Sequence, residues 1–353
     1  MKISVIFKNL LIGGVLTDIE CENGKITSIG KTDADGIDMG GKRAYAGLFD
    51  IHTHGLGGID TMDVKIETLS KLYASAGTTS FCPTTMTAPM DDIKALLSSE
   101  YESHGAKIRG FHLEGPYINE KFSGAQNKEF ICNPSDELEG FDNVSLVTVA
   151  PELDGAMDYI KFSKAKICVG HTSADYNTVC QAADAGAVCV SHTFNAMPPL
   201  HHREPSVVGA AFDKNMYVQV ICDGIHIHPS VIRILYSLFG ADRMILISDS
   251  MRACGLPDGE YELGGYRISV KDKIARTETG ALAGSTSTLL DCVKKAIEFG
   301  IDEADAFKMA SETPAKMLGL NCGKLEVGCD CDFIVLDDNM QLSSVVINGK
   351  IVK

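Results

Sequence analysis

The middle of the chain alternates between short apolar runs and longer amphipathic segments. Eight apolar runs of strand length occur between residues 44 and 248, and most are separated by segments with helical periodicity. These predicted strands are Ala44–His52, Thr78–Pro83, Ile108–Leu113, Ser145–Ala150, Ile167–Gly170, Val188–His192, Val218–Cys222 and Met244–Ser248. Continuous apolar strands separated by helices are typical of a parallel sheet covered on both faces.

Helical segments lie between these runs and also follow the last one. The clearest are Ile66–Ala76, Asp91–His104, Tyr176–Ala185 and Ser230–Phe239, with Leu289–Phe299 and Ala304–Leu318 after the eighth strand. Eight strand–helix repeats in roughly 270 residues match a (β/α)8 barrel of the TIM type, an α/β fold. A doubly wound open sheet is the alternative. It is disfavoured because no Gly-x-Gly-x-x-Gly turn follows the first strand.

Both ends of the chain alternate apolar and polar residues, as short β-hairpins do. At the start, Ile3–Ile12 and Gly14–Ile29 surround the turn dipeptide Asn23-Gly24, and at the end Asp332–Asp337 precedes Ser344–Val352. Neither end has enough strands to be stable alone. We therefore expect both termini to pair into one small β-sandwich domain beside the barrel. The predicted domains are 1–45 plus 320–353 for the β-domain and 46–319 for the catalytic barrel.

Composition and charge narrow the class of protein. The 353 residues include 47 acidic and 32 basic side chains, a net charge of −15, with 45% hydrophobic and 22% charged residues. This is ordinary globular usage and excludes a disordered or collagen-like chain. A pI near 5.1 argues against nucleic-acid binding, although a few local cations could still hold an anionic substrate. No apolar run approaches the ~18 residues of a membrane span.

Cysteine usage indicates a reduced compartment. The twelve cysteines are scattered along the chain, and Cys168, Cys189 and Cys222 lie inside apolar runs, where a thiol behaves as a small core residue. The close pair Cys329 and Cys331 lacks partners for a zinc knuckle. Lys8 falls where a signal peptide would need its apolar centre. We therefore expect a cytoplasmic protein without membrane or nucleic-acid partners.

Polar residues that suit metal ligation follow several predicted strands. His52 and His54 end the first strand, Glu114 the third, His171 the fifth, His192 the sixth and Asp249 the eighth. In a barrel these strand ends share one mouth, so the six side chains are expected to converge. Imidazoles and carboxylates suit zinc, iron, manganese or cobalt. A lone histidine is more often structural, and His104, His201 and His228 keep that interpretation; the coincidence of six predicts a metal-dependent hydrolase site.

Several motifs together resemble the family of N-acetylglucosamine-6-phosphate deacetylases in the amidohydrolase superfamily. They are Phe111–Asn119 (FHLEGPYIN), Gly170–Asp175 (GHTSAD), His192–Met197 (HTFNAM), Arg203–Pro205 (REP), Asp223–His226 (DGIH), Ser248–Arg252 (SDSMR) and Leu282–Ser285 (LAGS). The resemblance runs from the DIHTH segment at residues 50–54 to the C-terminal hairpin. It implies a (β/α)8 barrel with a small β-domain, which agrees with the hydrophobic pattern.

The resemblance implies a metal centre and a general base. Glu114, His171 and His192 would hold the principal ion and leave a position open for water. Asp249 would take a proton from that water and return it to the departing amine, giving glucosamine 6-phosphate and acetate. The cofactor is expected to be one or two divalent transition-metal ions, zinc first, with iron, manganese or cobalt as alternatives.

The number of ions stays open because members of the family differ. His52 and His54 are intact here and would allow a second ion, with Glu114 as the bridge and Asp249 as an additional ligand. Some relatives carry a histidine at the position of Gln126 that polarises the substrate carbonyl. An amide N–H can donate to a developing oxyanion but cannot titrate.

Substrate contacts are also implied by the resemblance. Arg203 and His226 match a phosphate-binding pair, and the matching arginine comes from a neighbouring subunit, which predicts a homodimer with a shared phosphate site. The alternative for Arg203 is a solvated loop charge. The other positions predicted to contact the sugar phosphate are Ala125, Gln126, Asn195, Ala196, Asp223, Gly224, Ile225, Leu282, Ala283 and Gly284. Ser285 is interpreted as a helix cap rather than a nucleophile.

Three alternative functions remain. A galactosamine-6-phosphate deacetylase would differ by the orientation of one hydroxyl group. Cyclic amidases and dihydroorotases commonly bridge two metals with a carboxylated lysine, whereas the candidate bridge here is Glu114. A metal-free scaffold is disfavoured because all six ligand positions are filled. The sequence therefore predicts deacetylation of N-acetylglucosamine 6-phosphate in amino-sugar catabolism or recycling.

Overall fold

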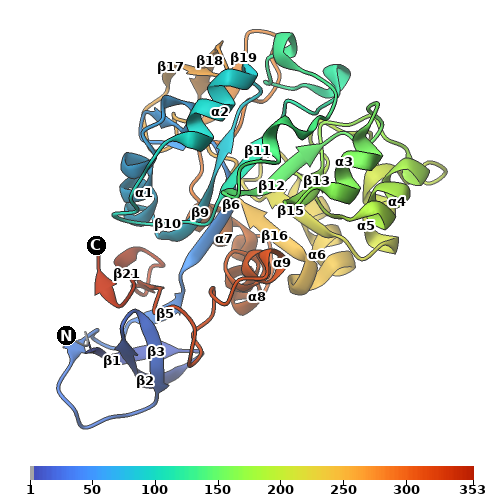
Figure 1. Ribbon diagram of the computed structural model, residues 1–353. Coiled ribbons are helices and arrows are strands. Elements are labelled where there is room, and N and C mark those ends of the chain that lie inside the picture. Colours follow the sequence, from blue (N-terminus) through green and yellow to red (C-terminus); the bar gives the residue numbers. More distant parts are fainter. Residues whose placement is uncertain (1–3) are drawn as a thin grey trace.

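The structure, a computed structural model, describes residues 4–353. Its larger part is a barrel of eight parallel strands, and a smaller sheet made from both ends of the chain lies beside one end of that barrel (Figure 1). Ile3, the first residue of the predicted N-terminal hairpin, lies outside the described residues. The predicted fold class, a barrel with a second domain built from both termini, is confirmed.

The barrel strands follow one another in sequence order around the ring. They are β6 (Leu48–Thr53), β9 (Thr78–Thr85), β11 (Phe111–Glu114), β12 (Val144–Val149), β13 (Lys166–Val169), β14 (Ala187–Val190), β15 (Tyr217–Ile221) and β16 (Met244–Ile247). A short strand β10 (Lys107–Ile108) also pairs with β9. The ring closes between β6 and β16, where the Asp249 amide donates to the His52 carbonyl at 3.0 Å. An Asp50 carboxylate oxygen accepts the Ser248 amide at the same seam.

The first predicted strand, Ala44–His52, is divided in the structure. Its first half is β5 (Arg43–Ala46), which joins the terminal sheet, and only β6 belongs to the barrel. The switch falls at Gly47, whose amide donates to the Asp332 carbonyl at 3.0 Å. A Cβ at Gly47 would lie 2.1 Å from the Thr79 hydroxyl oxygen, so the chain can change sheets only where a residue without a side chain passes that close.

Helices cover the outside of the barrel (Figure 1). They are α1 (Ile66–Ser75), α2 (Met90–Ser98), α3 (Ala156–Phe162), α4 (Tyr176–Ala185), α5 (Ser206–Asp213), α6 (Pro229–Arg243) and α7 (Leu289–Glu298), followed by α8 and α9. Helix α2 is shorter than predicted and ends at Ser98 instead of His104. Within residues 4–353, the structure contains no helix with the length and apolar character needed to cross a membrane.

The prediction of a single helix over Ala304–Leu318 is wrong. The structure has two helices there, α8 (Glu303–Met309) and α9 (Glu312–Leu318), with Ser311 in a non-helical conformation between them. Pro314 explains the break, because proline lacks the amide hydrogen that an uninterrupted helix would need at that position. In the first turn of α9 the missing hydrogen costs nothing, since the first four amides of a helix are unpaired.

The terminal sheet joins the two predicted hairpins. Its strands are β1 (Ser4–Ile12), β2 (Val15–Glu22), β3 (Lys25–Ile29), β4 (Ile37–Asp38), β5, β20 (Phe333–Leu336), β21 (Leu342–Ile347) and β22 (Lys350–Ile351). The N-terminal and C-terminal strands meet where β5 pairs with β20. Phe7 and Phe333, from opposite ends of the chain, pack edge to face with ring centroids 5.0 Å apart. Neither terminus therefore forms this core by itself.

An ion-pair cluster connects the terminal segment to the N-terminal ends of the barrel strands. Lys107 lies 2.9 Å from a carboxylate oxygen of Asp330 and 2.7 Å from one of Asp332. Lys25 and Arg109 also contact Asp330. Burial alone would raise the pKa of Asp330, but these three cations hold it well below its ordinary value. Burial raises the pKa of Asp332 in spite of Lys107.

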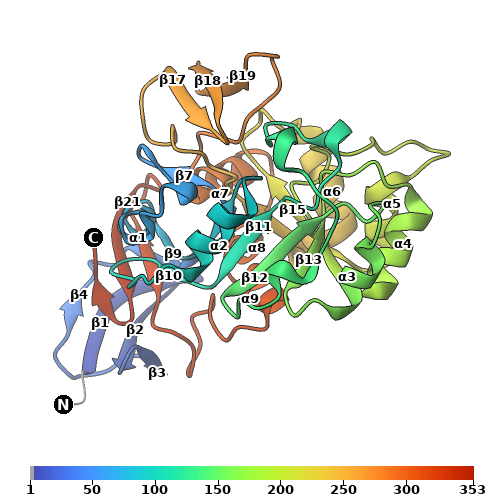
Figure 2. The same ribbon diagram turned by 45° about the horizontal axis from the view of Figure 1, so that its top comes forward.

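A three-stranded antiparallel sheet follows the last barrel strand and was not predicted. It consists of β17 (Gly259–Leu263), β18 (Tyr266–Lys271) and β19 (Ile274–Thr277), and it stands apart from the barrel strands at the top of Figure 2. Leu263 and Ile268 of this sheet pack with Met86 and Met251, which follow barrel strands. The Gly264-Gly265 pair between alternating segments was the sequence signal for its first turn.

Candidate functional site

The six predicted metal-ligand residues lie together at the C-terminal ends of the barrel strands. His52 is in β6 and Glu114 ends β11, while His54, His171, His192 and Asp249 follow β6, β13, β14 and β16 within two residues. All six are buried, with at most 7% of their surface exposed. The barrel therefore produces the convergence that strand order predicts.

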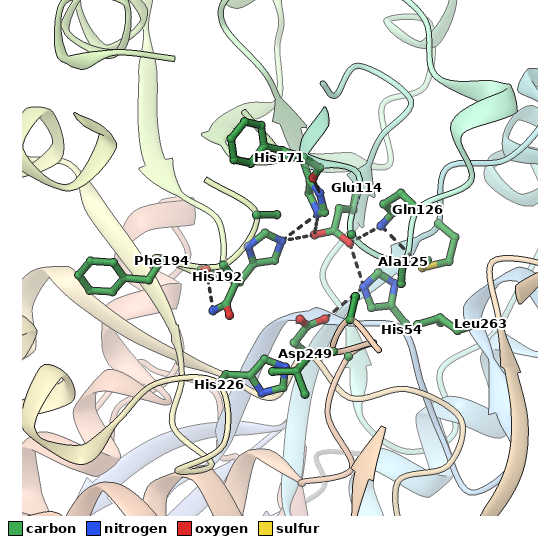
Figure 3. A pocket seen from close by; sticks show the side chains of 18 of the residues that line it. His54, Glu114, Ala125, Gln126, His171, His192, Phe194, His226, Asp249 and Leu263 are labelled. Atoms are coloured by element: carbon green, nitrogen blue, oxygen red, sulfur yellow. Dashed lines mark hydrogen bonds and ion pairs between the residues drawn. The ribbon is translucent and has the colours of Figure 1, made fainter. Parts of the chain in front are cut away.

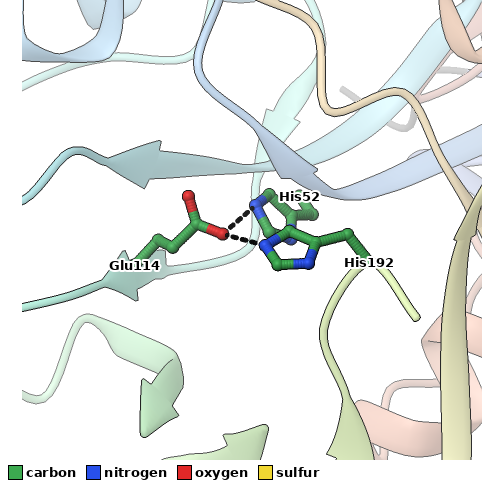
Figure 4. A group of neighbouring side chains, drawn as sticks. All are labelled: His52, Glu114 and His192. Carbon is green, nitrogen blue, oxygen red and sulfur yellow. Dashed lines mark hydrogen bonds and ion pairs between the residues drawn. The ribbon is translucent and has the colours of Figure 1, made fainter. Parts of the chain in front are cut away.

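Glu114 is the centre of this group. One of its carboxylate oxygens lies 3.0 Å from His52 Nε2, 2.9 Å from His192 Nε2 and 3.3 Å from His171 Nε2. The other oxygen lies 3.1 Å from His54 Nε2 (Figure 3). Figure 4 shows the His52 and His192 rings facing the same oxygen, His52 from β6 and His192 from the segment after β14. Glu114 thus contacts both the first-strand histidines and the later pair.

Asp249 lies beside the first-strand histidines. Its Oδ1 is 3.3 Å from His54 Nε2 and 3.7 Å from His52 Nε2. Two sets of ligand atoms are close enough to share an ion. The first set comes from His52, Glu114 and His192, and the second comes from His52, His54 and Asp249. His52 belongs to both sets.

The hydrogen bonds at Nδ1 of two histidine rings, on the side away from Glu114, show whether these residues fit a metal ion. His52 Nδ1 lies 2.8 Å from the Gln219 side-chain carbonyl oxygen, and His171 Nδ1 lies 2.7 Å from the Phe122 backbone oxygen. Carbonyl oxygens only accept, so each neutral ring carries its proton on Nδ1 and directs an Nε2 lone pair toward Glu114. Lone pairs that face a carboxylate at about 3 Å repel unless a positive charge lies between them. The residues present therefore fit a metal ion.

The electrostatics of the site also require positive charge. Burial disfavours a charged His52, but Glu114 and Asp249 outweigh that effect and raise the pKa of His52 to about 9. Burial likewise disfavours ionised carboxylates, yet the surrounding histidines hold the pKa of Glu114 well below its ordinary value and lower that of Asp249. Both carboxylates are therefore ionised at neutral pH, and protons or metal ions must balance them.

The backbone is strained where three of these residues leave their strands. His171, His192 and Asp249 have φ values of 46°, 24° and 46°, in the left-handed region that residues with a side chain rarely adopt. Neighbouring segments hold two of them, since the Asn119 amide donates to His171 at 2.8 Å and the Ser285 amide donates to Asp249 at 2.7 Å. Such conformations cost about 1–3 kcal/mol each and cluster at functional sites.

A pocket of about 420 Å³ opens directly above the six residues, and many predicted substrate contacts line it. Gln126 is the most constrained of these. Its Nε2 donates to Glu114 at 2.7 Å, and its Oε1 accepts the Thr87 amide at 2.6 Å, so the backbone fixes which end of the amide faces the site. The predicted residues that line the pocket are Ala125, Gln126, Asn195, Ala196, His226, Leu282 and Gly284.

Asp223 lies behind the pocket and orients His226. It accepts the Ile225 and His226 amides at 2.8 and 2.9 Å, and its other oxygen lies 2.7 Å from His226 Nδ1. Burial would raise the pKa of Asp223, but these hydrogen bonds and the His226 ring lower it. The contact at Nδ1 leaves His226 Nε2 for a ligand. Gly224 and Ile225 belong to the same turn and are not among the residues lining the pocket.

Two further predicted contacts lie outside the pocket of their own chain. Arg203 is exposed on the loop between β14 and α5, where its guanidinium lies 2.7 Å from His202 Nε2. Ala283 is buried in the core beneath the three-stranded sheet. Within residues 4–353, neither contributes to the pocket wall.

Other pocket residues were not predicted. Leu263 depends on the missed sheet, and Met86 ends up beside the site through packing rather than through a motif. Phe194 and Lys121 lie within or next to quoted motifs, so their place after barrel strands was the signal that could have found them. The remaining lining residues missed from the sequence are Phe122, Gly124 and Ala281.

A parallel barrel whose strand ends carry histidines around a shared carboxylate defines the class of metal-dependent hydrolases. The amidohydrolase family model matches residues 43–352, so the chain belongs to the amidohydrolase family, whose members use divalent metal ions. The resemblance to N-acetylglucosamine-6-phosphate deacetylases is confirmed by curated relatives.

Three relatives illustrate the match. The N-acetylglucosamine-6-phosphate deacetylase of Vibrio furnissii is 39% identical over 94% of this chain and 89% of its own length. That of Bacillus subtilis is 37% identical over 86% and 83%. An N-acetylgalactosamine-6-phosphate deacetylase of Escherichia coli O157:H7 is 36% identical over 86% and 85%.

Solved structures agree with these relatives. The N-acetylglucosamine-6-phosphate deacetylase of Thermotoga maritima superimposes with a TM-score of 0.92 at 30% identity, covering 99% of both chains. A variant of the Mycobacterium smegmatis enzyme in complex with N-acetyl-D-glucosamine 6-phosphate gives 0.91 at 29% identity, again over 99% of both chains.

Proposed function

We propose that this protein hydrolyses the acetamide of N-acetyl-D-glucosamine 6-phosphate to D-glucosamine 6-phosphate and acetate, in amino-sugar catabolism or recycling. The observation that carries the proposal is the arrangement of four imidazole nitrogens around Glu114, with Asp249 beside them at the floor of a pocket. The relatives that act on amino-sugar phosphates support the choice of substrate.

Glu114, His171 and His192 would hold the principal metal ion, and His52 and His54 a second one, with Asp249 as an additional ligand. The contact of Glu114 with both histidine pairs supports a bridging role and thus two ions. A bound divalent ion would lower the pKa of a water molecule and polarise the acetamide carbonyl. Zinc is the first choice, and iron, manganese and cobalt accept the same ligands.

Asp249 would act as general base and then as general acid. Its lowered pKa keeps it ionised at neutral pH, so it can accept a proton from the attacking water. It would then deliver that proton to the amide nitrogen, because an amine leaves poorly without one. Gln126 Nε2 faces the site and would donate to the oxygen that develops negative charge.

The phosphate group would be held by His226 together with an arginine from a second subunit. His226 lines the pocket with its Nδ1 already committed to Asp223, while Arg203 is exposed and away from its own pocket. This supports a homodimer in which each Arg203 reaches the pocket of its neighbour. Asn195, Ala196, Leu282 and Gly284 would contact the sugar.

The proposed location is the cytoplasm. All twelve cysteines are free thiols, and most of them are buried in apolar surroundings. Reduced cysteines in this number are typical of proteins that stay in a reducing compartment.

A deacetylase for N-acetylgalactosamine 6-phosphate is the second candidate. The relative from Escherichia coli O157:H7, at 36% identity, carries that name. The two substrates differ only in the orientation of one hydroxyl group.

The test is steady-state hydrolysis by zinc-loaded protein of N-acetylglucosamine 6-phosphate, its galactosamine epimer and unphosphorylated N-acetylglucosamine. We expect the phosphorylated glucosamine to give the highest kcat/KM and chelation to abolish turnover. A preference for the epimer would favour the second candidate. Equal turnover without phosphate would contradict the roles of Arg203 and His226, and no turnover by protein that holds zinc would contradict the deacetylase itself.

A further inference from the structure

Inside the barrel, directly below the metal-ligand residues, lies a second layer of buried polar side chains. Gln219 of β15, Thr148 of β12 and His112 of β11 all point into this layer, and each is fully buried. Cys168 of β13 and Ser191, which follows β14, also belong to it. Polar groups are costly in a barrel core unless they are paired, so the partners of each group show what the layer holds in place.

Gln219 connects this layer to the site. Its side-chain oxygen lies 2.8 Å from His52 Nδ1, and its Nε2 donates to Cys168 Sγ at 3.6 Å. Its backbone oxygen also accepts the Thr193 amide at 2.8 Å, one residue beyond His192. Because the amide nitrogen is directed toward Cys168, the carbonyl oxygen is the end that meets His52.

This contact decides which nitrogen of His52 is available to a metal. A carbonyl oxygen can only accept, so His52 keeps a proton on Nδ1 and presents an Nε2 lone pair toward Glu114 and Asp249. In the other tautomer, Nδ1 and the Gln219 oxygen would be two acceptors 2.8 Å apart. That tautomer would also place an N–H where an ion would have to lie.

The other polar groups around His52 do not provide this constraint. His112 packs edge-on against the His52 ring with centroids 4.4 Å apart, but its Nε2 is 2.8 Å from the Thr148 hydroxyl. Among the described residues, His54 and His192 have no hydrogen-bond partner at Nδ1. Gln219 therefore constrains the one histidine that belongs to both candidate ion sets.

We propose that Gln219 is a positioning residue that locks His52 in the Nδ1-protonated tautomer and so prepares the ion position formed with His54 and Asp249. The metal ion itself rests on the proposed function, whereas the tautomer does not. Loss of an orienting partner of this kind typically weakens metal affinity about 10–100-fold.

The test uses the full chain loaded with Zn²⁺ and labelled with ¹⁵N-histidine. Two-bond ¹H–¹⁵N correlation spectra report which ring nitrogen carries a proton, and the His52 signals are identified by their absence in His52→Gln. Competition with a chromophoric chelator gives the stoichiometry and affinity for Zn²⁺. Gln219→Met removes the acceptor at similar volume, and Gln219→Glu keeps an acceptor. Thr148→Val is the matched control, because it removes the buried hydrogen bonds to His112 and Ser191 in the same layer and leaves the contact between Gln219 and His52 in place.

We expect wild-type His52 to carry its proton on Nδ1. Gln219→Met should lose one Zn²⁺ position or weaken it 10–100-fold, while Gln219→Glu and Thr148→Val keep both positions. A wild-type spectrum with the His52 proton on Nε2 would overturn the proposal, and this outcome does not depend on any variant folding. Unchanged zinc affinity in folded Gln219→Met would overturn it as well. Failure to hydrolyse the sugar phosphate would contradict the proposed function and leave the tautomer result standing.

Discussion

The barrel carries a buried cluster of ionisable side chains at each end, and the two are built differently. The lower cluster lies at the N-terminal ends of the strands, where Lys107 and Arg109 contact Asp330 and Asp332. Its cations face anions, at 2.7–2.9 Å around Lys107. In the upper cluster, at the C-terminal ends, imidazole nitrogens face the Glu114 carboxylate at similar distances.

The difference shows which cluster can bind something. In the lower cluster, at the N-terminal ends of the strands, each carboxylate already has a cation of the same chain as its partner, so the cluster holds the terminal sheet against the barrel. The upper cluster is balanced only when protons or metal ions join it, and its backbone is strained at His171, His192 and Asp249. Similar burial therefore serves stability in one cluster and chemistry in the other.

The largest effect is expected from Asp249→Asn in the upper cluster. The amide cannot accept the proton of the attacking water, so kcat should fall about 10³-fold, the range expected for loss of a general base. The measurement is kcat for N-acetylglucosamine 6-phosphate in zinc-loaded protein. Because His52 and His54 favour the ionised form of Asp249, the neutral amide also costs some stability, so the melting temperature of the variant is measured beside kcat to show that it is folded. A variant that retains more than a tenth of wild-type kcat would remove Asp249 from the mechanism.

The reverse result is expected from Asp330→Asn in the lower cluster. Lys107 and Arg109 would lose an anionic partner, which should cost about 3 kcal/mol of unfolding free energy, the lower end for breaking a buried ion pair. Denaturant unfolding measures this cost, and kcat at 25 °C should stay within about twofold. A loss of activity without a loss of stability would contradict the division between the clusters.

A substitution at Arg203, which lies outside both clusters, is expected to have an intermediate effect on activity. Replacing Arg203 with Met should lower kcat/KM for the phosphorylated substrate about 10–100-fold, through loss of charge-assisted hydrogen bonds worth about 1.5–3 kcal/mol. Activity on unphosphorylated N-acetylglucosamine should not change. In mixed dimers of Arg203→Met and Asp249→Asn subunits, one of the two pockets should recover full function. No recovery would contradict a phosphate site shared between subunits.

The smallest effect is expected in the acid dependence of stability. Because the folded-state pKa of Asp330 lies below its unfolded value, its stabilising contribution is complete above about pH 4 and is lost as the pH falls further. Asp330→Asn should therefore flatten the loss of melting temperature below pH 4. Asp332 has a raised pKa, so Asp332→Asn should instead steepen that loss. The same acid dependence in both variants and the wild type would show that neither carboxylate is perturbed.

The eight barrel strands and six ligand positions were predictable because each depends on a local pattern, an apolar run followed by a polar residue. The division of the first strand at Gly47 was not, since it depends on how closely Thr79 approaches. The sheet around Leu263 was missed because its short strands have exposed alternating residues rather than apolar runs. The role of Gln219 was hidden because it acts through His52, which belongs to another strand. Asp223 was predicted to contact the sugar, whereas in the structure it orients His226 of the same turn.

The hydrogen bond from the Asp249 amide to the His52 carbonyl closes the barrel, and it joins two residues of the proposed metal centre. The seam where the first and last strands meet is therefore also the place where chemistry would occur. Neighbouring seam contacts join positions 195 and 198 residues apart in the chain. A growing or partly unfolded chain that lacks β16 would keep the proposed ligands of the earlier barrel strands but not Asp249, the proposed base. Catalytic competence would then arise in the same event that closes the barrel, so turnover would measure how much of the protein has a closed barrel.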